Sequence, residues 1–183
     1  MKIKYFIEIG SCDFNTLNNF AKHGWEGCII DPMSEYLDNL EKKKGVHYVH
    51  AGMDHDDGER KIYFAPKSVV DHDRDFAGMS TFYTADERGY GSKHLTESKV
   101  VKTMSFKTLI EKYNIKKIDF LKIDTEGYDF EILKMFPWEL TKLNPALIKV
   151  EHKYINNIEM KEFLNIKGYH AFIEKDDIYA IKL

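Results

Sequence analysis

Carboxylates and glycines follow two short apolar segments of this chain. In the first, Glu8 and Gly10 follow the run 5–7, and in the second, Asp124 and Glu126 follow the run 118–121. In open α/β sheets, ligands collect outside the carboxyl ends of the strands. We therefore predict that the two segments are buried strands and that their ends border one crevice.

The first strand end has the composition of a ligand-binding loop. Gly10, followed by Ser11 and Asp13, would let a ligand approach the backbone amides. The phosphate-binding patterns GxxxxGK[ST] and GxGxxG are both absent. Asp31 stands where a Rossmann-type site has its ribose-binding acid, about 20 residues after the first glycine. Alternatively, Glu8 pairs with a lysine and Asp31 caps a helix that begins near residue 34.

The elements that must position these residues alternate along the chain, which is typical of a mostly parallel sheet covered by helices. We expect an α/β fold of Rossmann-like type, with a seven-stranded sheet whose C-terminal pair is antiparallel. The expected strands are 5–9, 25–31, 46–51, 118–123, 146–151, 169–173 and 178–181, and the expected helices are 15–23, 34–44, 105–113, 130–136 and 158–166. A turn at 56–58 should add an edge strand at 60–64.

The segment 65–99 shows no helical or strand period. A connection of this length inside a compact domain is usually functional, so we interpret it as a substrate lid or insertion. Ser80 and Thr81 within it, and Tyr128 after the second motif, are the residues we expect to contact a substrate.

Composition bounds the function classes. With 183 residues and 43% apolar content, we expect a single domain spanning 1–183. The net charge of −3 gives no electrostatic support for binding nucleic acid. The two cysteines lack metal-ligand spacing, and no run is long enough for a membrane helix. We expect reduced thiols, no membrane association and a cytoplasmic location, with the oligomeric state left open.

Five segments of the chain together resemble the FkbM family of S-adenosylmethionine-dependent methyltransferases. The strongest element is the Lys-Ile-Asp-x-Glu-Gly motif at 122–127. The segments are 6–10, 29–32, 105–110, 118–127 and 147–152. One departure is Phe14, which occupies a place where members often carry another glycine.

The resemblance implies a class I methyltransferase sheet with S-adenosylmethionine lying across its carboxyl ends. Gly10 and Ser11 would border the methionine moiety, and Asp31 would hold the ribose hydroxyls. Pro32 and Met33 would flank the adenine, and Gly52 and Met53 would close the adenine side. An acidic rim of Glu8, Asp13, Asp31 and Asp124 would suit a cofactor that is cationic at sulfur.

The reaction that the resemblance implies is methyl transfer to a hydroxyl of a sugar, a glycan or another small acceptor. Such a transfer usually needs a base for the hydroxyl proton. The candidates are Asp124, Glu126 and His152, and His152 is preferred because its reference pKa of about 6.5 suits proton abstraction near neutrality. Equally, His152 could simply be hydrogen-bonded at a strand end.

A metal site is a further alternative, because Asp124, Glu126 and His152 could ligate a divalent ion. Nothing in the spacing demands one, so we predict no metal. Two other functions stay open. One is a cofactor-binding module without transfer activity, and the other is a nicotinamide-dependent oxidoreductase, which the missing GxGxxG disfavours.

Overall fold

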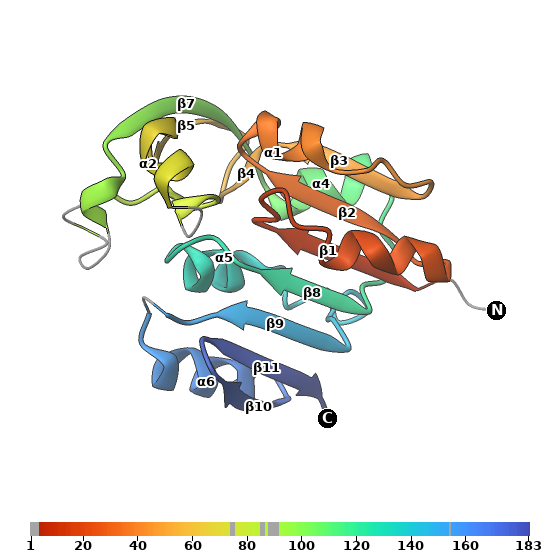
Figure 1. Cartoon of the computed structure of the whole chain (residues 1–183). Helices are drawn as coiled ribbons and strands as arrows, with labels where there is room; N and C mark the ends of the chain where they lie inside the picture. The colour runs from red at the N-terminus through yellow and green to blue at the C-terminus, as the bar shows by residue number, and fades with distance from the viewer. Residues whose placement is uncertain (1–3, 74–75, 85–86, 88–91, 154) are drawn as a thin grey trace.

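The computed structural model describes residues 4–73, 76–84, 87, 92–153 and 155–183. Its largest element is a seven-stranded sheet in the order β10-β11-β9-β8-β1-β2-β3 (Figure 1). The strands are β1 Tyr5–Ile9, β2 Glu26–Asp31, β3 Val46–His50, β8 Phe120–Ile123, β9 Leu147–Glu151, β10 Tyr169–Glu174 and β11 Asp177–Lys182. The seven strands and the antiparallel β10–β11 pair confirm the prediction.

The expectation of a mostly parallel sheet needs correction, because the sheet is mixed. The pairings from β3 across to β9 are parallel. Strand β11 is antiparallel to both of its neighbours. The tight turn after β10 sends the chain straight back, so β11 enters the sheet between β10 and β9.

Helices cover the two faces of the sheet because successive residues of each strand point to opposite faces. On one face, Phe6 and Ile29 pack against Leu17 of η1 and Leu37 of α1. On the other, the alternate strand residues form the larger core with α4, α5 and α6. These helices are η1 Leu17–His23, α1 Ser34–Asn39, α4 Phe106–Lys112, α5 Asp129–Met135 and α6 Asn157–Ile166. Within the described ranges, no helix has the length and apolar character needed to cross a membrane.

The order of the strands reverses between β1 and β8. The chain leaves β1 to build β2 and β3 on one side, and later returns to place β8 on the other side. Ligands in open α/β sheets bind outside the carboxyl ends of the strands at such a switch point. Gly10 follows β1 and Asp124 follows β8, so both predicted motifs lie at this point.

A second sheet arches beyond the carboxyl ends of β1 and β2 (Figure 1). It has the order β4-β7-β5-β6, with strands β4 Gly52–Met53, β5 Gly58–Phe64, β6 Ser80–Thr81 and β7 Glu97–Met104. The predicted strand at 60–64 is therefore β5, but the prediction that it lies at an edge is wrong, because β5 lies between β7 and β6 in this second sheet. The chain turns off the main sheet directly after β3, and β4 then pairs with β7.

The segment 65–99 is more regular than its sequence suggested. It contains α2 Lys67–His72, β6, the short 3₁₀ helix η3 Ser92–His94 and the start of β7. Strand β6 pairs with the end of β5 through only two residues, Ser80 and Thr81. A strand of two residues has no detectable alternation, so the sequence pattern could not reveal it.

Gly10 provides a test of the packing at the switch point. Its φ is +77°, and a Cβ added there would lie 1.8 Å from the backbone oxygen of Asp124. We expect Gly10→Ala to lower the free energy of unfolding by about 3 kcal/mol or more, because strain adds to a clash with backbone. Gly24→Ala is the matched control, since Gly24 has a φ of +78° and nothing within 4 Å of an added Cβ. It should cost about 1 kcal/mol. Urea unfolding measures both, and equal losses would contradict the role given to the contact.

Candidate functional site

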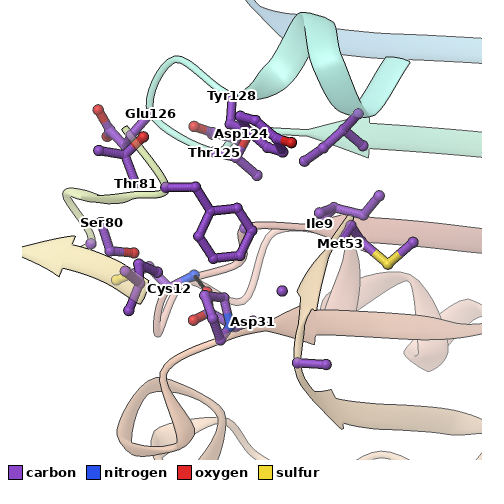
Figure 2. A pocket seen from close by; sticks show the side chains of 18 of the residues that line it. Ile9, Cys12, Asp31, Met53, Ser80, Thr81, Asp124, Thr125, Glu126 and Tyr128 are labelled. Atoms are coloured by element: carbon purple, nitrogen blue, oxygen red, sulfur yellow. Dashed lines mark hydrogen bonds between the residues drawn. The ribbon is translucent and has the colours of Figure 1, made fainter. Parts of the chain in front are cut away.

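A cavity opens at the switch point, between the main sheet and the second sheet (Figure 2). The empty space in it and at its mouth, part of which is open to solvent, is about 650 Å³. Four parts of the chain form its walls: the ends of β1 and β2, the β3–β4 connection, residues 77–82, and the turn after β8. Its lining residues are Ile9, Gly10, Cys12, Phe14, Asp31, Pro32, Ala51, Gly52, Met53, Ile62, Ala77, Gly78, Ser80, Thr81, Phe82, Asp124, Thr125, Glu126, Tyr128 and Ile132.

The cavity brings together ten of the residues that the sequence singled out. They are Gly10, Asp31, Pro32, Gly52, Met53, Ser80, Thr81, Asp124, Glu126 and Tyr128. Five others lie outside the lining: Glu8, Ser11, Asp13, Met33 and His152. Ser11 and Met33 are buried behind the wall, and Asp13 lies in the loop after β1. Sequence analysis gave Cys12 no role in the site, and it named Phe14 only as a departure from the family pattern.

Asp31 fastens two walls of the cavity to each other. One carboxylate oxygen accepts a hydrogen bond from the backbone N–H of Cys12 at 2.9 Å, and the other accepts one from Met33 at 2.8 Å. Burial raises the pKa of Asp31 to about 6, although the backbone N–H groups oppose that rise. The backbone N–H of Ser11 also donates to this carboxylate. A carboxylate has about four acceptor positions, so Asp31 can still accept a hydrogen bond from a ligand hydroxyl.

Asp129, the first residue of α5, shapes the turn after β8. This fully buried carboxylate accepts hydrogen bonds from the N–H groups of Thr125 at 2.7 Å and Gly127 at 2.9 Å. The turn needs such support because Glu126 and Gly127 both have positive φ. Sequence analysis did not select Asp129 as a site residue. An acid two or four residues after a turn is the signal that could have identified it.

A buried ion pair lies beneath the cavity. Glu8 on β1 and Lys122 on β8 are neighbours in register, with 3.0 Å between Oε1 and Nζ. Lys122 also reaches Oδ2 of Asp124 at 3.3 Å. The other oxygen of Glu8 accepts the N–H of Leu17 at 3.0 Å. Glu8 therefore takes the alternative role considered for it, a partner of a lysine inside the sheet, and its carboxylate does not face the cavity.

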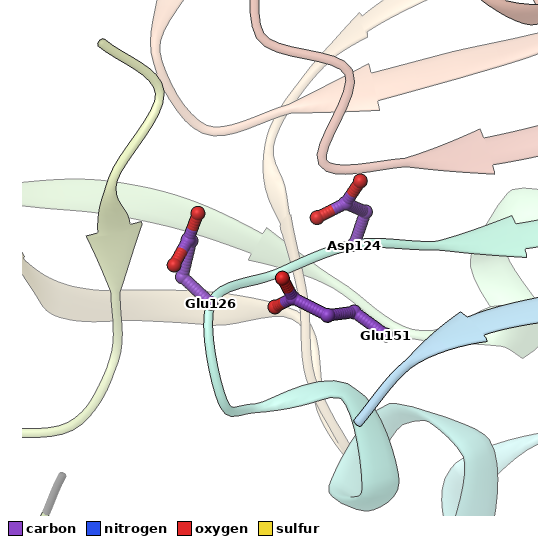
Figure 3. Close-up of side chains that lie close together, drawn as sticks. All are labelled: Asp124, Glu126 and Glu151. Atoms are coloured by element: carbon purple, nitrogen blue, oxygen red, sulfur yellow. The ribbon is translucent and has the colours of Figure 1, made fainter. Parts of the chain in front are cut away.

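Three carboxylates gather where β8 and β9 end: Asp124, Glu126 and Glu151 (Figure 3). One oxygen from each lies within 4.8 Å of the others. Burial and the nearby Glu126, Asp129 and Asp124 raise the pKa of Glu151 to about 9. Its Oε2 is buried and has no hydrogen-bond partner among the described residues. Register could have identified Glu151, because Lys122 pairs with Lys149 and two further residues bring Asp124 opposite Glu151.

His152 does not join this group. Its Nε2 donates a hydrogen bond to the backbone oxygen of Lys175 at 3.0 Å, and its N–H donates to Asp176. Both partners lie in the turn between β10 and β11. The side chain that projects toward Asp124 from the end of β9 is the preceding residue, Glu151 (Figure 3). We therefore do not retain His152 as the base.

The possible metal ligands also differ from those predicted, because Glu151 takes the place of His152 beside Asp124 and Glu126. The oxygen spacing of Asp124, Glu126 and Glu151 would admit a divalent cation, whereas the set containing His152 is not assembled. Carboxylates alone are typical ligands of hard cations such as Mg²⁺. Acidic groups also gather without an ion, so the cluster by itself does not establish a metal site.

Tyr128 faces the cavity with its ring, whereas its hydroxyl is held by other groups. The hydroxyl donates to Oδ1 of Asp54 at 3.0 Å and accepts from Nη1 of Arg60 at 2.7 Å. Arg60 also donates to Oδ2 of Asp54 at 2.9 Å, and its guanidinium lies over the rings of Phe82 and Tyr128. This cluster joins the second sheet to α5 and fixes one wall of the cavity.

Residues 77–82 form the opposite wall and contact both sides of the cavity. Gly78 donates its N–H to the hydroxyl of Tyr36 on α1 at 3.1 Å. It also packs so closely on Cys12 that an added Cβ would lie 2.9 Å from Sγ. Phe82 contacts Gly52 and meets Tyr128 edge to face. The predicted lid segment therefore does border the cavity.

The sequence was compared with models of known protein families, and one model matches the part of the chain that forms this site. The model of the methyltransferase FkbM domain matches residues 8–171, which includes both strand-end motifs and the whole described cavity lining. The chain belongs to the FkbM methyltransferase family. A search of the curated proteins found no match. The cavity at the switch point is accordingly the candidate active site of this FkbM domain.

The buried ion pair predicts unequal effects of two lysine substitutions in this FkbM domain. Lys122→Met would leave Glu8 buried without its cation, and we expect a loss of about 3–5 kcal/mol in the free energy of unfolding. Lys149→Met is the matched control, since Lys149 is the register neighbour of Lys122 and pairs with the partly exposed Asp177. It should cost within about 1 kcal/mol. Chemical denaturation measures both losses. Similar losses for the two variants would show that the buried ion pair stabilises the fold no more than the partly exposed one.

Because the pKa of Glu151 is raised in the folded protein, we expect the free energy of unfolding to depend on pH. Its pKa in the folded protein is about 9, against 4.5 as the ordinary value. The folded protein therefore keeps a proton that the unfolded chain releases, and stability falls as pH rises through this window, by at most about 1.4 kcal/mol per pH unit. Glu151→Gln cannot ionise, so its stability relative to the wild type should grow between pH 5 and 9.

Urea unfolding at three pH values tests this expectation. Glu131→Gln, which changes a partly exposed glutamate paired with Lys134, is the control and should show no such trend. A difference between Glu151→Gln and wild type that stays constant with pH would contradict the expectation.

Proposed function

We propose that this FkbM domain is an S-adenosylmethionine-dependent O-methyltransferase of class I, acting on a hydroxyl of a sugar, a glycan or another small acceptor. One observation carries the proposal: the cavity lies at the switch point and combines a close backbone approach at Gly10 with the carboxylates of Asp31 and Asp124. Family membership supports the methyl-transfer activity. We propose S-adenosylmethionine as the cofactor and a hydroxyl compound as the acceptor.

The lining fits the parts of S-adenosylmethionine. Asp31 offers carboxylate lone pairs for ribose hydroxyls, and it is held rigidly by two backbone N–H groups. Pro32, Ala51 and Met53 supply an apolar wall beside it, which suits an adenine ring. Gly10 and Asp124 lie in contact at the other side, so a methionine moiety would lie against backbone and a carboxylate.

When bound, S-adenosylmethionine supplies a methyl group on a positively charged sulfur. In an in-line displacement the carbon–sulfur bond breaks as the bond to the acceptor oxygen forms, and the hydroxyl proton must leave to a base. Asp124 and Glu126 are the carboxylates that line the cavity near the turn after β8 and could accept this proton. Their place at the ends of rigid elements keeps them in position.

The acceptor side of the cavity is assigned to the second sheet and the turn after β8. Ser80 and Thr81 offer hydroxyl groups, and the ring of Tyr128 offers an apolar surface. Phe14, whose side chain is 55% exposed, adds an aromatic surface in the lining. Hydroxyl groups beside aromatic rings suit a sugar, which has polar edges and apolar faces.

Calorimetric titration with S-adenosylmethionine and S-adenosylhomocysteine tests the proposal. We expect saturable binding of both and no binding of NAD. Asp31→Asn should weaken both affinities at least about tenfold, because it removes the charge that accepts the ribose hydroxyls. Since the pKa of Asp31 is about 6, wild-type affinity should also fall below pH 6, and the variant should lack that dependence.

Asp119→Asn is the matched control. Asp119 also accepts a backbone N–H, that of Tyr5, but it precedes β8 and lies at the amino end of the strands. It should leave both affinities unchanged. Absence of binding by either sulfur compound would overturn the proposal, whereas preferential binding of NAD would favour an oxidoreductase. Tight binding without transfer to any acceptor would favour a cofactor-binding module.

A further inference from the structure

All the charged side chains among the described residues that line the cavity are carboxylates. The described lining includes the carboxylates of Asp31, Asp124 and Glu126, and none of these lining residues is Lys, Arg or His. Glu151 adds a third carboxyl group beside Asp124 and Glu126, with one oxygen of each within 4.8 Å of the others (Figure 3). A ligand in this cavity therefore faces carboxylates from β2 and from the turn after β8, with the protonated carboxyl group of Glu151 close behind them.

Three cationic side chains lie near the walls: Lys122, Arg60 and Lys153, whose charge acts on Glu151 and opposes the rise in its pKa. Lys122 lies beneath Asp124 and is shared with Glu8, so these three groups together carry one negative charge. Arg60 donates to Asp54 and to the hydroxyl of Tyr128. None of these three cations is among the described residues that line the cavity.

We propose that Asp124 and Glu126 make the cavity select its ligand by charge, so that it binds the sulfonium cofactor more tightly than the neutral product of the transfer. The inference rests on the proposed function. S-adenosylmethionine and S-adenosylhomocysteine share the adenosine and methionine parts, so Asp31, Gly10 and the apolar wall contact the same groups in both. The two ligands differ in the methyl group and in the positive charge at sulfur.

Charge interactions reach across a cavity of this size. Two unit charges several ångströms apart still interact strongly at the effective dielectric of a protein cleft, whereas hydrogen bonds require direct contact. Loss of the positive charge during transfer would therefore weaken binding of the product without any movement of the protein. The consequence is preferential release of product, which a site that recognises only the shared parts cannot achieve.

Calorimetric affinities of three ligands test the inference without any acceptor. S-adenosylmethionine and sinefungin, which has an amine-bearing carbon in place of the sulfonium, are cationic there, and S-adenosylhomocysteine is neutral. We expect both cations to bind wild-type protein at least about tenfold more tightly than the thioether, equivalent to about 1.4 kcal/mol. Glu126→Gln and Asp124→Asn should each lower this ratio about threefold or more.

Glu131→Gln is the matched control, because it removes the same charge from α5 outside the cavity lining. It should keep the wild-type ratio. The inference is overturned if the thioether binds wild-type protein as tightly as the cations, or if the ratio survives both cavity substitutions. If none of the three ligands binds, the proposed function itself fails, and the inference fails with it.

Discussion

The structure depends on the contact between the ends of β1 and β8. The two strands are far apart in sequence, and they meet in register with Glu8 beside Lys122 inside the sheet. Above that ion pair, Gly10 packs against the backbone of Asp124 so closely that no side chain would fit. An ammonium group shared by two carboxylates in a buried position leaves little freedom for the strands to slip, since any other register would leave a charge without a partner.

The contact between β1 and β8 also determines the geometry of the cavity. Asp31 joins the loop after β1 to the turn after β2, and Asp129 holds the turn after β8. Both are buried carboxylates that accept backbone N–H groups, and burial raises the pKa of both, to about 6 and about 7. The second sheet then closes the cavity through Arg60, Tyr128 and Asp54. Rigid main-sheet ends therefore form one side of the site, and a smaller sheet with short pairings forms the other.

Sequence patterns identified most of the main sheet because its strands are long enough to show apolar runs and turns. They were less informative about the second sheet, where β4 and β6 have two residues each. The prediction of an edge strand at β5 was correct about the strand and wrong about its edge position, since its partner β7, which pairs Gly58 with Thr103 and Phe64 with Glu97, lies far along the chain. The mixed character of the main sheet likewise follows from where β11 enters it, which no local pattern records.

Residue types and spacing by themselves identified the strand-end motifs with Gly10, Asp31, Asp124 and Glu126, because ligands collect outside the carboxyl ends of buried strands. The resemblance to the family, which the motifs carried, added Pro32, Gly52 and Met53 to the predicted lining. Only the tertiary structure decided which of two adjacent residues, Glu151 or His152, projects toward the site. It also decided that Glu8 belongs to the core and that Lys122 is its partner. The physical reason is the same in each case: a strand alternates its side chains between two faces, and the register with neighbouring strands determines what each face meets.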